Sequence, residues 1–581
     1  MSAPLRIANC SGFYGDRLAA AREMITGGPI DFLTGDYLAE LTMMILWKAR
    51  QKDSSRGYAA TFLKQMEDVL GEALDRGIKI VTNAGGLNPA GLSAELRALC
   101  DRLGLKAKIA HIEGDDLMPQ LESLVQAGHA LKNLDTGRPL SELRAKPLSA
   151  NAYLGAWGIV EALKQGADVV VCPRVTDASV VVGPAAWHFR WQRTDWDRLA
   201  GAVAAGHVVE CGAQCTGGNY AFFQEVPGLE HPGFPIAEIA EDGSSVITKH
   251  PGTGGLVSVG TVTAQLLYET DTPKYLNPDV AARFDTIELA QEGPDRVRMS
   301  GVRGEPAPPT VKVCLNYLGG YRNQMTFVLV GLDIEQKAAL VERTLRRELD
   351  ENSFDTFAID LARTDKPDAL TNHEAAALLK VTVKSHDAKR VDRAFSGPII
   401  EMVLSSYPGL FCTTPPSEAQ AFGVYWPTLV PASVPRQEVV LEDGTRIPIE
   451  PTAAAQVGTP IKIERSPLPA VAAGPTRRAA LGTLFGARSG DKGGNANVGV
   501  WARDKAGYAW LASFLTVERF RHLIPEAAHL EIRRFELPNL NALNFVVVGL
   551  LGEGVASSLR FDPQAKSLGE YLRSRVVDLP G

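Results

Sequence analysis

Short runs of β-branched residues alternate with amphipathic periodicities over residues 1–270 of the chain. The run Asp168–Cys172 is typical of a strand buried on both faces, and Pro173 ends it because proline cannot donate to a strand ladder. Apolar spacings of three and four residues predict helices, at Leu41–Arg50, Tyr58–Asp75 and Asn151–Gln165 among others. Strands are predicted at Leu5–Asn9, Ile30–Leu33, Ile78–Thr82, Lys106–His111, Asp168–Cys172 and His207–Glu210.

This alternation predicts right-handed βαβ units and a parallel sheet, so residues 1–270 are expected to form an α/β domain. Each predicted strand runs into a polar segment, and parallel strands would bring all six segments to one edge of the sheet. The opposite connections, such as Arg76-Gly77, are short and chemically plain. The convergence of polar segments is the main sequence argument for an active site.

Carboxylates at this expected edge are candidates for proton transfer, namely Asp36, Asp177 and Glu210. Asp177 belongs to a polar segment that follows the Asp168–Cys172 run. The alternative to a role in proton transfer is that Asp177 or Ser179 only caps a helix. Glycine pairs could offer backbone N–H groups to an oxyanion or a phosphate, although tight turns explain either pair equally well. The candidate binding residues here are Asn83, Gly85, Gly86, Arg174, Thr176, Ser179, Gly217 and Gly218.

A second glycine-rich segment, residues 249–255, closes this region. Lys249 and His250 beside Gly254 and Gly255 could bind an anion, and a solvated turn is the alternative. No Gly-x-Gly-x-x-Gly motif follows a strand, so nicotinamide or flavin chemistry is unsupported. Cys211 and Cys215 lack the further ligands that a zinc site needs, and no metal site is expected.

Beyond residue 270 the pattern changes. Residues 271–450 mix strands and helices without βαβ order, which predicts an α+β region, and residues 451–476 are an Ala- and Pro-rich linker. Residues 477–581 form a further α+β unit, in which a predicted strand at Ala480–Phe485 opens into a loop of glycines, charges and amides. More polar groups than a turn needs predict a binding or catalytic loop, with candidates Arg488, Ser489, Asp491, Lys492, Asn495 and Asn497.

Composition limits the classes of function. The 581 residues are 45% hydrophobic and 22% charged, with a net charge of −7, which argues against nucleic acid and anionic membranes as partners. No apolar run is long enough to span a bilayer, no signal peptide is recognised at the start, and seven cysteines fit a reducing compartment. A cytoplasmic protein is expected, and a homo-oligomer, as is common for large α/β proteins.

The segments quoted above, together with four others, resemble the acyclic terpene utilisation (AtuA) family. The resemblance extends over nearly all of residues 1–450. A separate C-terminal segment, residues 488–497, is similar to the signature of a ferredoxin-like domain that accompanies the family. The other four are Ser11–Arg17, Thr34–Glu40, Glu210–Gly212 and Tyr275–Asp279. Cys215 departs from the aliphatic residue expected in its loop.

The resemblance implies a role in the breakdown of branched or terpenoid acids, which proceeds through coenzyme A thioesters. Coenzyme A is then expected as part of the substrate, with no tightly bound cofactor. A hydratase or a carbon–carbon lyase would need groups that move protons, for which Asp36, Asp177, Glu210, His250 and Asp491 are candidates. Lys249, Arg488 and Lys492 could meet the coenzyme's phosphates. The alternative is a non-catalytic acyl-CoA-binding or scaffold subunit of a carboxylase complex.

Overall fold

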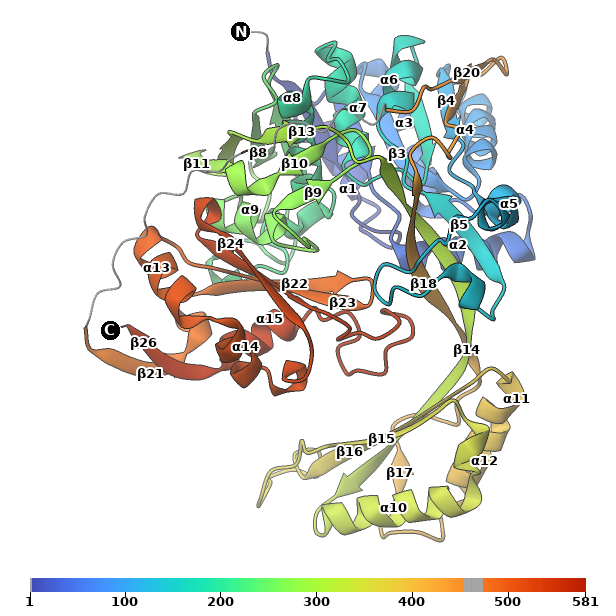
Figure 1. Ribbon diagram of the computed structural model, residues 1–581, viewed down its shortest axis with the longest axis vertical. Coiled ribbons are helices and arrows are strands. Elements are labelled where there is room, and N and C mark those ends of the chain that lie inside the picture. Colours follow the sequence, from blue (N-terminus) through green and yellow to red (C-terminus); the bar gives the residue numbers. More distant parts are fainter. Residues whose placement is uncertain (1–2, 453–460, 462–473, 581) are drawn as a thin grey trace. The chain divides into compact units, whose positions relative to one another are not determined.

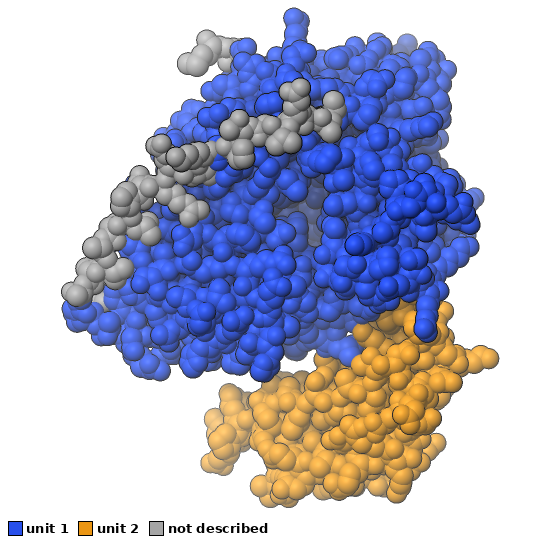
Figure 2. All heavy atoms as spheres, in the orientation of Figure 1, with its two compact units in different colours: residues 1–316, 425–581 blue, residues 317–424 orange. Residues whose placement is uncertain are grey.

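The computed structural model describes residues 3–452, 461 and 474–580, so most of the expected linker lies outside the described residues. The chain divides into two units, residues 1–316 with 425–581 and residues 317–424 (Figures 1 and 2). The chain leaves the first unit within β14 (Thr310–Val330) and returns within β18 (Gln420–Pro431).

The first unit is built on a mixed sheet whose centre is parallel, as the sequence predicts. β6 (Val169–Pro173) lies between two parallel neighbours, and all five of its residues are buried. The strands, in spatial order, are β11 (Glu288–Gly293), β12 (Arg296–Ser300), β8 (Ser245–Lys249), β7 (Pro235–Ile239), β1 (Leu5–Asn9), β2 (Phe32–Gly35), β3 (Lys79–Gly86), β6, β4 (Ile109–Glu113), β19 (Glu438–Val440) and β20 (Arg446–Pro448).

Helices cover both faces of this sheet. On one face, α3 (Ala60–Asp75) buries Phe62, Met66, Val69 and Leu70, the spacing of one helical stripe, against strand residues that include Val169 and Val171. This face also carries α1 (Ala20–Thr26) and α4 (Pro89–Leu103). The other face carries α6 (Trp157–Lys164), α7 (Ser179–His188) and α8 (Trp196–Val209), while α2 (Glu40–Lys52), α5 (Leu121–Gln126) and α9 (Val259–Leu266) lie in the connections.

Two elements predicted within residues 1–270 are wrong. His207–Glu210 is the end of α8 and not a strand, because Val208 and Val209 continue a helix of small, fully buried residues whose packing overrides β propensity. Asn151–Gln165 is not one helix, since β5 (Pro147–Ala152) pairs with β14 before α6 begins. A small sheet packs against α8 and consists of β9 (Lys274–Leu276), β10 (Ala281–Arg283) and β13 (Arg303–Glu305).

The second unit is an α+β fold with its own core. The strand β14 pairs with β16 (Ala376–Ser385) in its sheet. Val341, Leu345 and Phe395 lie in the core beneath this sheet. The remaining elements are α10 (Ile334–Glu348), β15 (Thr356–Ala362), α11 (Ala388–Val391), α12 (Arg393–Glu401) and β17 (Phe411–Cys412).

Residues 476–580 form the C-terminal domain of the first unit. The expected loop at residues 486–497 is a β-hairpin, β22 (Gly486–Lys492) and β23 (Asn495–Trp501), that turns at Gly493-Gly494. Its sheet continues through β25 (Ala542–Val547) and β24 (Ile532–Leu537), covered by α13 (Lys505–Phe514), α14 (Val517–Leu523) and α15 (Leu568–Ser574). A second pair comprises β21 (Thr476–Ala480) and β26 (Val576–Pro580). The strand predicted at Ala480–Phe485 is wrong, because β21 ends at Ala480 and Leu481–Thr483 forms a 3-10 helix.

The hairpin packs closely on the segment after α9. A Cβ at Gly490 would lie 2.4 Å from the ring of Tyr268, and one at Gly499 would lie 2.4 Å from Leu267 Cβ. Asn497 Oδ1 accepts the backbone N–H of Glu269 at 2.9 Å. Glycines at these two positions therefore permit a close approach that brings the end of β22 to the edge of the large sheet.

Candidate functional site

Three neighbouring parallel strands bring polar side chains together where they end. Asp36 follows β2, Asn83 lies in β3, and Arg174 with Asp177 follows β6. Asn83 Nδ2 donates to Asp36 Oδ1 at 2.5 Å, and Asn83 Oδ1 accepts the N–H of Tyr37 at 2.8 Å. The arrangement at the carboxyl ends of parallel strands follows directly from the topology of the sheet.

Arg174 is the central cation of this edge. Its guanidinium is buried, donates to Asp177 Oδ1 at 2.9 Å and to the carbonyl of Leu38 at 2.9 Å, and lies 4.2 Å from the ring centre of Tyr153. Asp115 Oδ2 accepts the backbone N–H of Arg174 at 3.2 Å. Asp177 therefore forms an ion pair and not the helix cap that the sequence left open.

Glu40 and Lys312 extend the edge. Tyr153 Oη lies 3.0 Å from Glu40 Oε1, and Lys312 Nζ lies 3.7 Å from the same oxygen. Burial acts to raise the pKa of Glu40, but Lys312 and Arg174 outweigh it and lower that pKa to about 2. Burial lowers the pKa of Lys312. Glu40 is therefore a fixed carboxylate at neutral pH.

A further carboxyl group, that of Glu210, directly follows α8. Glu210 is buried, and its Oε1 lies 3.0 Å from His207 Nδ1. Burial, followed by the charges of Asp177 and Glu269, raises the pKa of Glu210 well above its usual range. The pKa of Asp36 is also raised well above its usual range, by burial and then by Asp177, although Arg174 opposes the rise.

The C-terminal domain adds charges to the same group. Lys492, at the end of β22, interacts electrostatically with Glu210, Glu269 and Glu40, and its Nζ lies 6.0 Å from the ring centre of Tyr275. Burial, then Glu269 and Glu40, raises the pKa of Asp491 to about 8. The site thus contains carboxyl groups whose pKa values are shifted in opposite directions.

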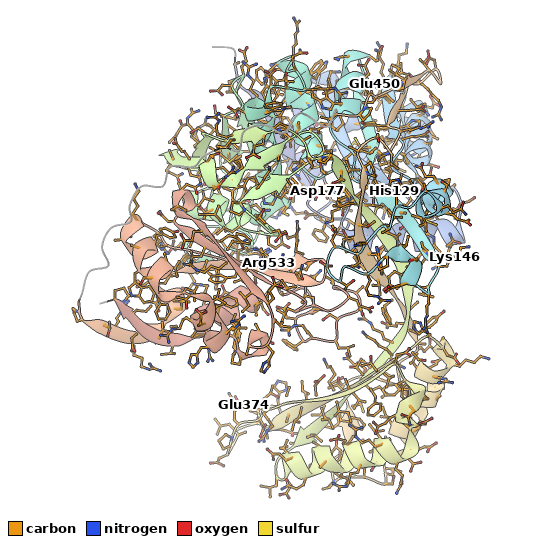
Figure 3. All side chains as sticks on the ribbon, viewed as in Figure 1. His129, Lys146, Asp177, Glu374, Glu450 and Arg533 are labelled. Carbon is orange, nitrogen blue, oxygen red and sulfur yellow. The ribbon has the colours of Figure 1, made fainter. Side chains whose placement is uncertain are left out.

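Several of these side chains remain in contact with solvent although protein surrounds them. Asp177, Glu40 and Lys312 keep 29%, 32% and 31% of their side-chain surface exposed, while Arg174 keeps 2%. Figure 2 shows the surface of the first unit hollowed near its centre, and Figure 3 places Asp177 in that region. We call this group the acidic recess, defined by Asp36, Glu40, Arg174, Asp177, Glu210, Glu269, Lys312, Asp491 and Lys492.

The other residues predicted to bind a ligand either lie outside the acidic recess or make structural contacts near it. Lys249 pairs with Asp295 at 3.0 Å, and His250 Nε2 lies 2.8 Å from the carbonyl of Met24, so both have internal partners. The N–H groups of Gly217 and Gly218 donate to the carbonyls of Gln214 and Ala213 and are not free for a ligand. Gly85 has no room for a Cβ, which would lie 2.5 Å from the carbonyl of Cys172, and Gly86 has φ +52°.

The polar residues of the β22–β23 hairpin divide into two groups. Asp491 and Lys492 reach the acidic recess, whereas Asn495 binds Asp135 and Asn497 binds Asn544. Ser489 Oγ accepts the N–H of Gly569 at 2.8 Å. Thr176, Ser179 and Arg488 also make structural contacts. The hydroxyls of Thr176 and Ser179 lie 2.5 Å apart, and Arg488 contacts Gln214 and the ring of Tyr268.

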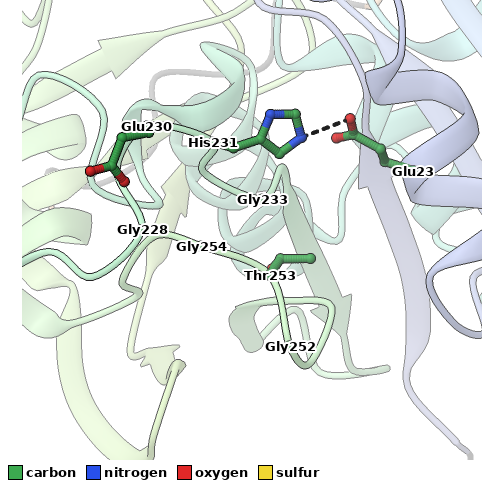
Figure 4. Close-up of a pocket in the computed structure, with 8 residues that line it drawn as sticks. All are labelled: Glu23, Gly228, Glu230, His231, Gly233, Gly252, Thr253 and Gly254. Atoms are coloured by element: carbon green, nitrogen blue, oxygen red, sulfur yellow. Dashed lines mark hydrogen bonds and ion pairs between the residues drawn. The ribbon is translucent and has the colours of Figure 1, made fainter.

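A separate surface hollow of about 370 Å³ lies beside the 249–255 segment (Figure 4). Gly252, Thr253 and Gly254 line it with His231, whose Nε2 lies 3.0 Å from Glu23 Oε1. His231 keeps 65% of its side-chain surface exposed. None of the residues of the acidic recess lines this hollow, and the acidic recess is the better candidate for chemistry.

The remaining candidate groups are possible metal ligands and the two cysteine thiols. Within residues 3–452, 461 and 474–580, no three His, Cys, Asp or Glu side chains are placed to hold a metal ion. Cys211 and Cys215 are free thiols, and burial raises the pKa of each. The same described residues contain no helix long and apolar enough to cross a membrane.

Sequence reasoning missed several residues of the acidic recess. Glu40 lies in a segment named only for its resemblance, and neither Glu269 nor Lys312 belongs to a recognised motif. Glu210 was expected at a strand end, yet it lies just after α8. A lysine within an apolar stretch, as at Lys312 between Val311 and Val313, is the signal that could have found one of them.

The fold and the site define an α/β protein with a recess of coupled carboxyl groups and a fused C-terminal domain. The profile of the acyclic terpene utilisation family protein AtuA matches residues 5–441, and that of the AtuA ferredoxin-like domain matches residues 479–578. The chain therefore belongs to the AtuA family, with the ferredoxin-like domain at its C-terminal end, and it is associated with acyclic terpene utilisation. Neither the curated proteins nor the solved structures include a match.

Proposed function

We propose that the protein is an enzyme that adds water to, or removes it from, a branched acyl-CoA thioester during the catabolism of terpenoid acids. The observation that carries the proposal is the cluster of carboxyl groups around Arg174 and Lys492, in which Asp177 pairs with Arg174 at 2.9 Å and Glu210 lies beside His207. Lys312 and Arg174 lower the pKa of Glu40 to about 2, whereas burial raises the pKa of Asp36 and of Glu210 well above the usual range and that of Asp491 to about 8. Pairs of carboxyls with separated pKa values are typical of general acid–base sites.

Hydration of a conjugated thioester needs two proton transfers. A carboxylate takes a proton from water as its oxygen bonds to the β-carbon, and the electron pair of the double bond moves toward the thioester oxygen. A carboxylic acid then delivers a proton to the α-carbon and restores the carbonyl. We assign the base role to Asp177, which is partly exposed, and the acid role to Glu210.

Negative charge on the thioester oxygen requires a nearby electrophilic group. Lys492 faces Glu210 and Glu269, and it supplies that charge in the proposed mechanism. Since the N–H groups of Gly217 and Gly218 are occupied, the glycine-based oxyanion hole expected at that pair is not proposed further. Coenzyme A enters as part of the substrate, and the proposal includes no other cofactor.

Two measurements test the proposal. Isothermal titration with a panel of saturated and unsaturated branched acyl-CoA thioesters identifies ligands, and the loss of absorbance of the conjugated thioester reports hydration. Asp177→Asn is expected to lower kcat at least about 100-fold with thioester binding retained. The exposed Asp101→Asn is the matched control and should keep full activity.

Full turnover by Asp177→Asn would remove Asp177 from the mechanism. Binding of thioesters without turnover by the unmodified protein would instead support the non-catalytic acyl-CoA-binding role. No binding of any thioester would exclude both.

A further inference from the structure

The side chains of His207 and Glu210 lie one helical turn apart at the end of α8 and are joined by one hydrogen bond. His207 Nδ1 is 3.0 Å from Glu210 Oε1, and both side chains are buried. Among the described residues, neither His207 Nε2 nor Glu210 Oε2 has a hydrogen-bond partner. The second carboxyl oxygen is therefore buried with its hydrogen-bonding capacity unused.

The imidazole is held rigidly in this contact. Its ring centre lies 5.0 Å from that of Tyr275 and 5.5 Å from that of Phe284, and these two rings stack at 4.9 Å. The backbone carbonyl of His207 accepts from Gln265 Nε2 at 3.3 Å. A ring packed against two aromatic neighbours cannot swing away from Glu210 without opening the core.

We propose that His207 is a positioning residue for Glu210, whose Oε1 accepts the Nδ1–H of the imidazole so that Oε2 alone exchanges a proton with a ligand. The identity of Glu210 as the acid rests on the proposed function. The hydrogen bond itself rests on the geometry of α8.

We place the proton of the neutral imidazole on Nδ1, opposite Glu210 Oε1. With the proton on Nδ1, the unpaired Nε2 is an acceptor, and buried acceptors without partners are less rare than buried donors, as backbone groups show. Burial, together with Lys492, lowers the pKa of His207 to about 4, so the ring is neutral at pH 7. A neutral ring that donates from Nδ1 orients the carboxyl and stabilises its ionised form after the proton leaves.

Charged and titratable groups face this pair from several elements. Asp36 follows β2, Arg174 and Asp177 follow β6, Glu269 follows α9, and Lys492 ends β22. Cys211 and Tyr275 also lie within electrostatic range of Glu210. Because these groups remain in every variant tested below, a change in the titration of Glu210 reports the loss of the imidazole.

Infrared difference spectroscopy of the full-length protein tests the inference without a substrate. The carbonyl band of protonated Glu210 is assigned as the band lost in Glu210→Gln, and its midpoint is followed against pH. His207→Phe and His207→Met remove the donor, so the midpoint should rise by about one pH unit. His207→Gln retains an N–H donor and should restore most of the shift.

A midpoint that stays unchanged or falls in folded His207→Phe or His207→Met would overturn the inference. The same holds if His207→Gln behaves like the apolar variants. Circular dichroism establishes which variants fold, and His207→Met offers a flexible side chain of similar volume if the aromatic one does not fit.

The alkaline limb of kcat/KM should move upward with the infrared midpoint, since the acid must be protonated to act. If the infrared shift occurs and no variant hydrates any thioester, the proposed function fails while the positioning role stands. If hydration occurs and the infrared midpoint does not move, the positioning role fails alone.

Discussion

Asp115 offers a quantitative test of how the edge of the sheet is held. The side chain is buried at the end of β4, where Oδ2 accepts Asn151 Nδ2 at 2.8 Å and the N–H of Arg174 at 3.2 Å. Burial raises its pKa from 3.8 to about 7. Asp115→Asn keeps the shape and an acceptor oxygen but cannot ionise.

The pH dependence follows from this shift. The folded protein binds the proton of Asp115 more tightly than the unfolded chain, so its contribution to stability is complete below about pH 3.8 and declines as the pH rises to about 7. The difference of about three pH units corresponds to about 4 kcal/mol. Asp115→Asn should therefore gain up to about 4 kcal/mol of unfolding free energy over the unmodified protein between pH 4 and pH 8.

Urea unfolding of both proteins at several pH values measures this gain, because the comparison cancels every other titrating group. The exposed Asp101→Asn is the matched control and should show no such trend. A stability difference that is constant with pH, or that shrinks as the pH rises, would refute the reasoning that burial keeps Asp115 protonated.

Three further predictions concern the hairpin and the residues outside the acidic recess. Gly490→Val should displace the hairpin from Tyr268, which lowers Tm by several degrees and weakens thioester binding at least about tenfold. The control is Gly293→Val, where a Cβ meets nothing within 4 Å, and it should change neither Tm nor binding. Lys492→Met should raise the pKa of His207 above about 4, followed by the imidazole resonances in NMR, and an unchanged value would show that Lys492 does not face the ring. His250→Ala should lower Tm through its lost contact with Met24 yet keep kcat, and a large loss of kcat would place His250 in the mechanism.

The sequence predicts the parallel centre of the sheet because its strands are buried on both faces. Val169–Val171 has no polar alternation, and Pro173 marks its end, so the neighbouring Arg174 and Asp177 could be placed at the edge from pattern alone. The predicted proximity of Asp36 and Asn83 rests on the same topology.

The remaining residues of the acidic recess depend on tertiary packing that a local pattern does not encode. The Val208-Val209 pair favours a strand locally, yet burial among the small residues of α8 makes it helical and changes how Glu210 is presented. The glycine-rich segment after Phe485 has the composition of a loop, yet β22 and β23 pair as a hairpin whose second strand also pairs with the distant β25. Lys312 reaches Glu40 because β14 pairs with β5, a long-range contact.

A crystal structure with an unreactive branched acyl-CoA thioether tests most directly whether residues from β2, β6, α8 and β22 form one binding site. The account predicts that the sulfur and the adjoining carbons lie within contact distance of Glu210 and Lys492, with Asp177 on the opposite side of the acyl chain. A ligand seated elsewhere, such as in the hollow beside His231 and Gly254, or Lys492 turned to bulk solvent in the complex, would contradict it.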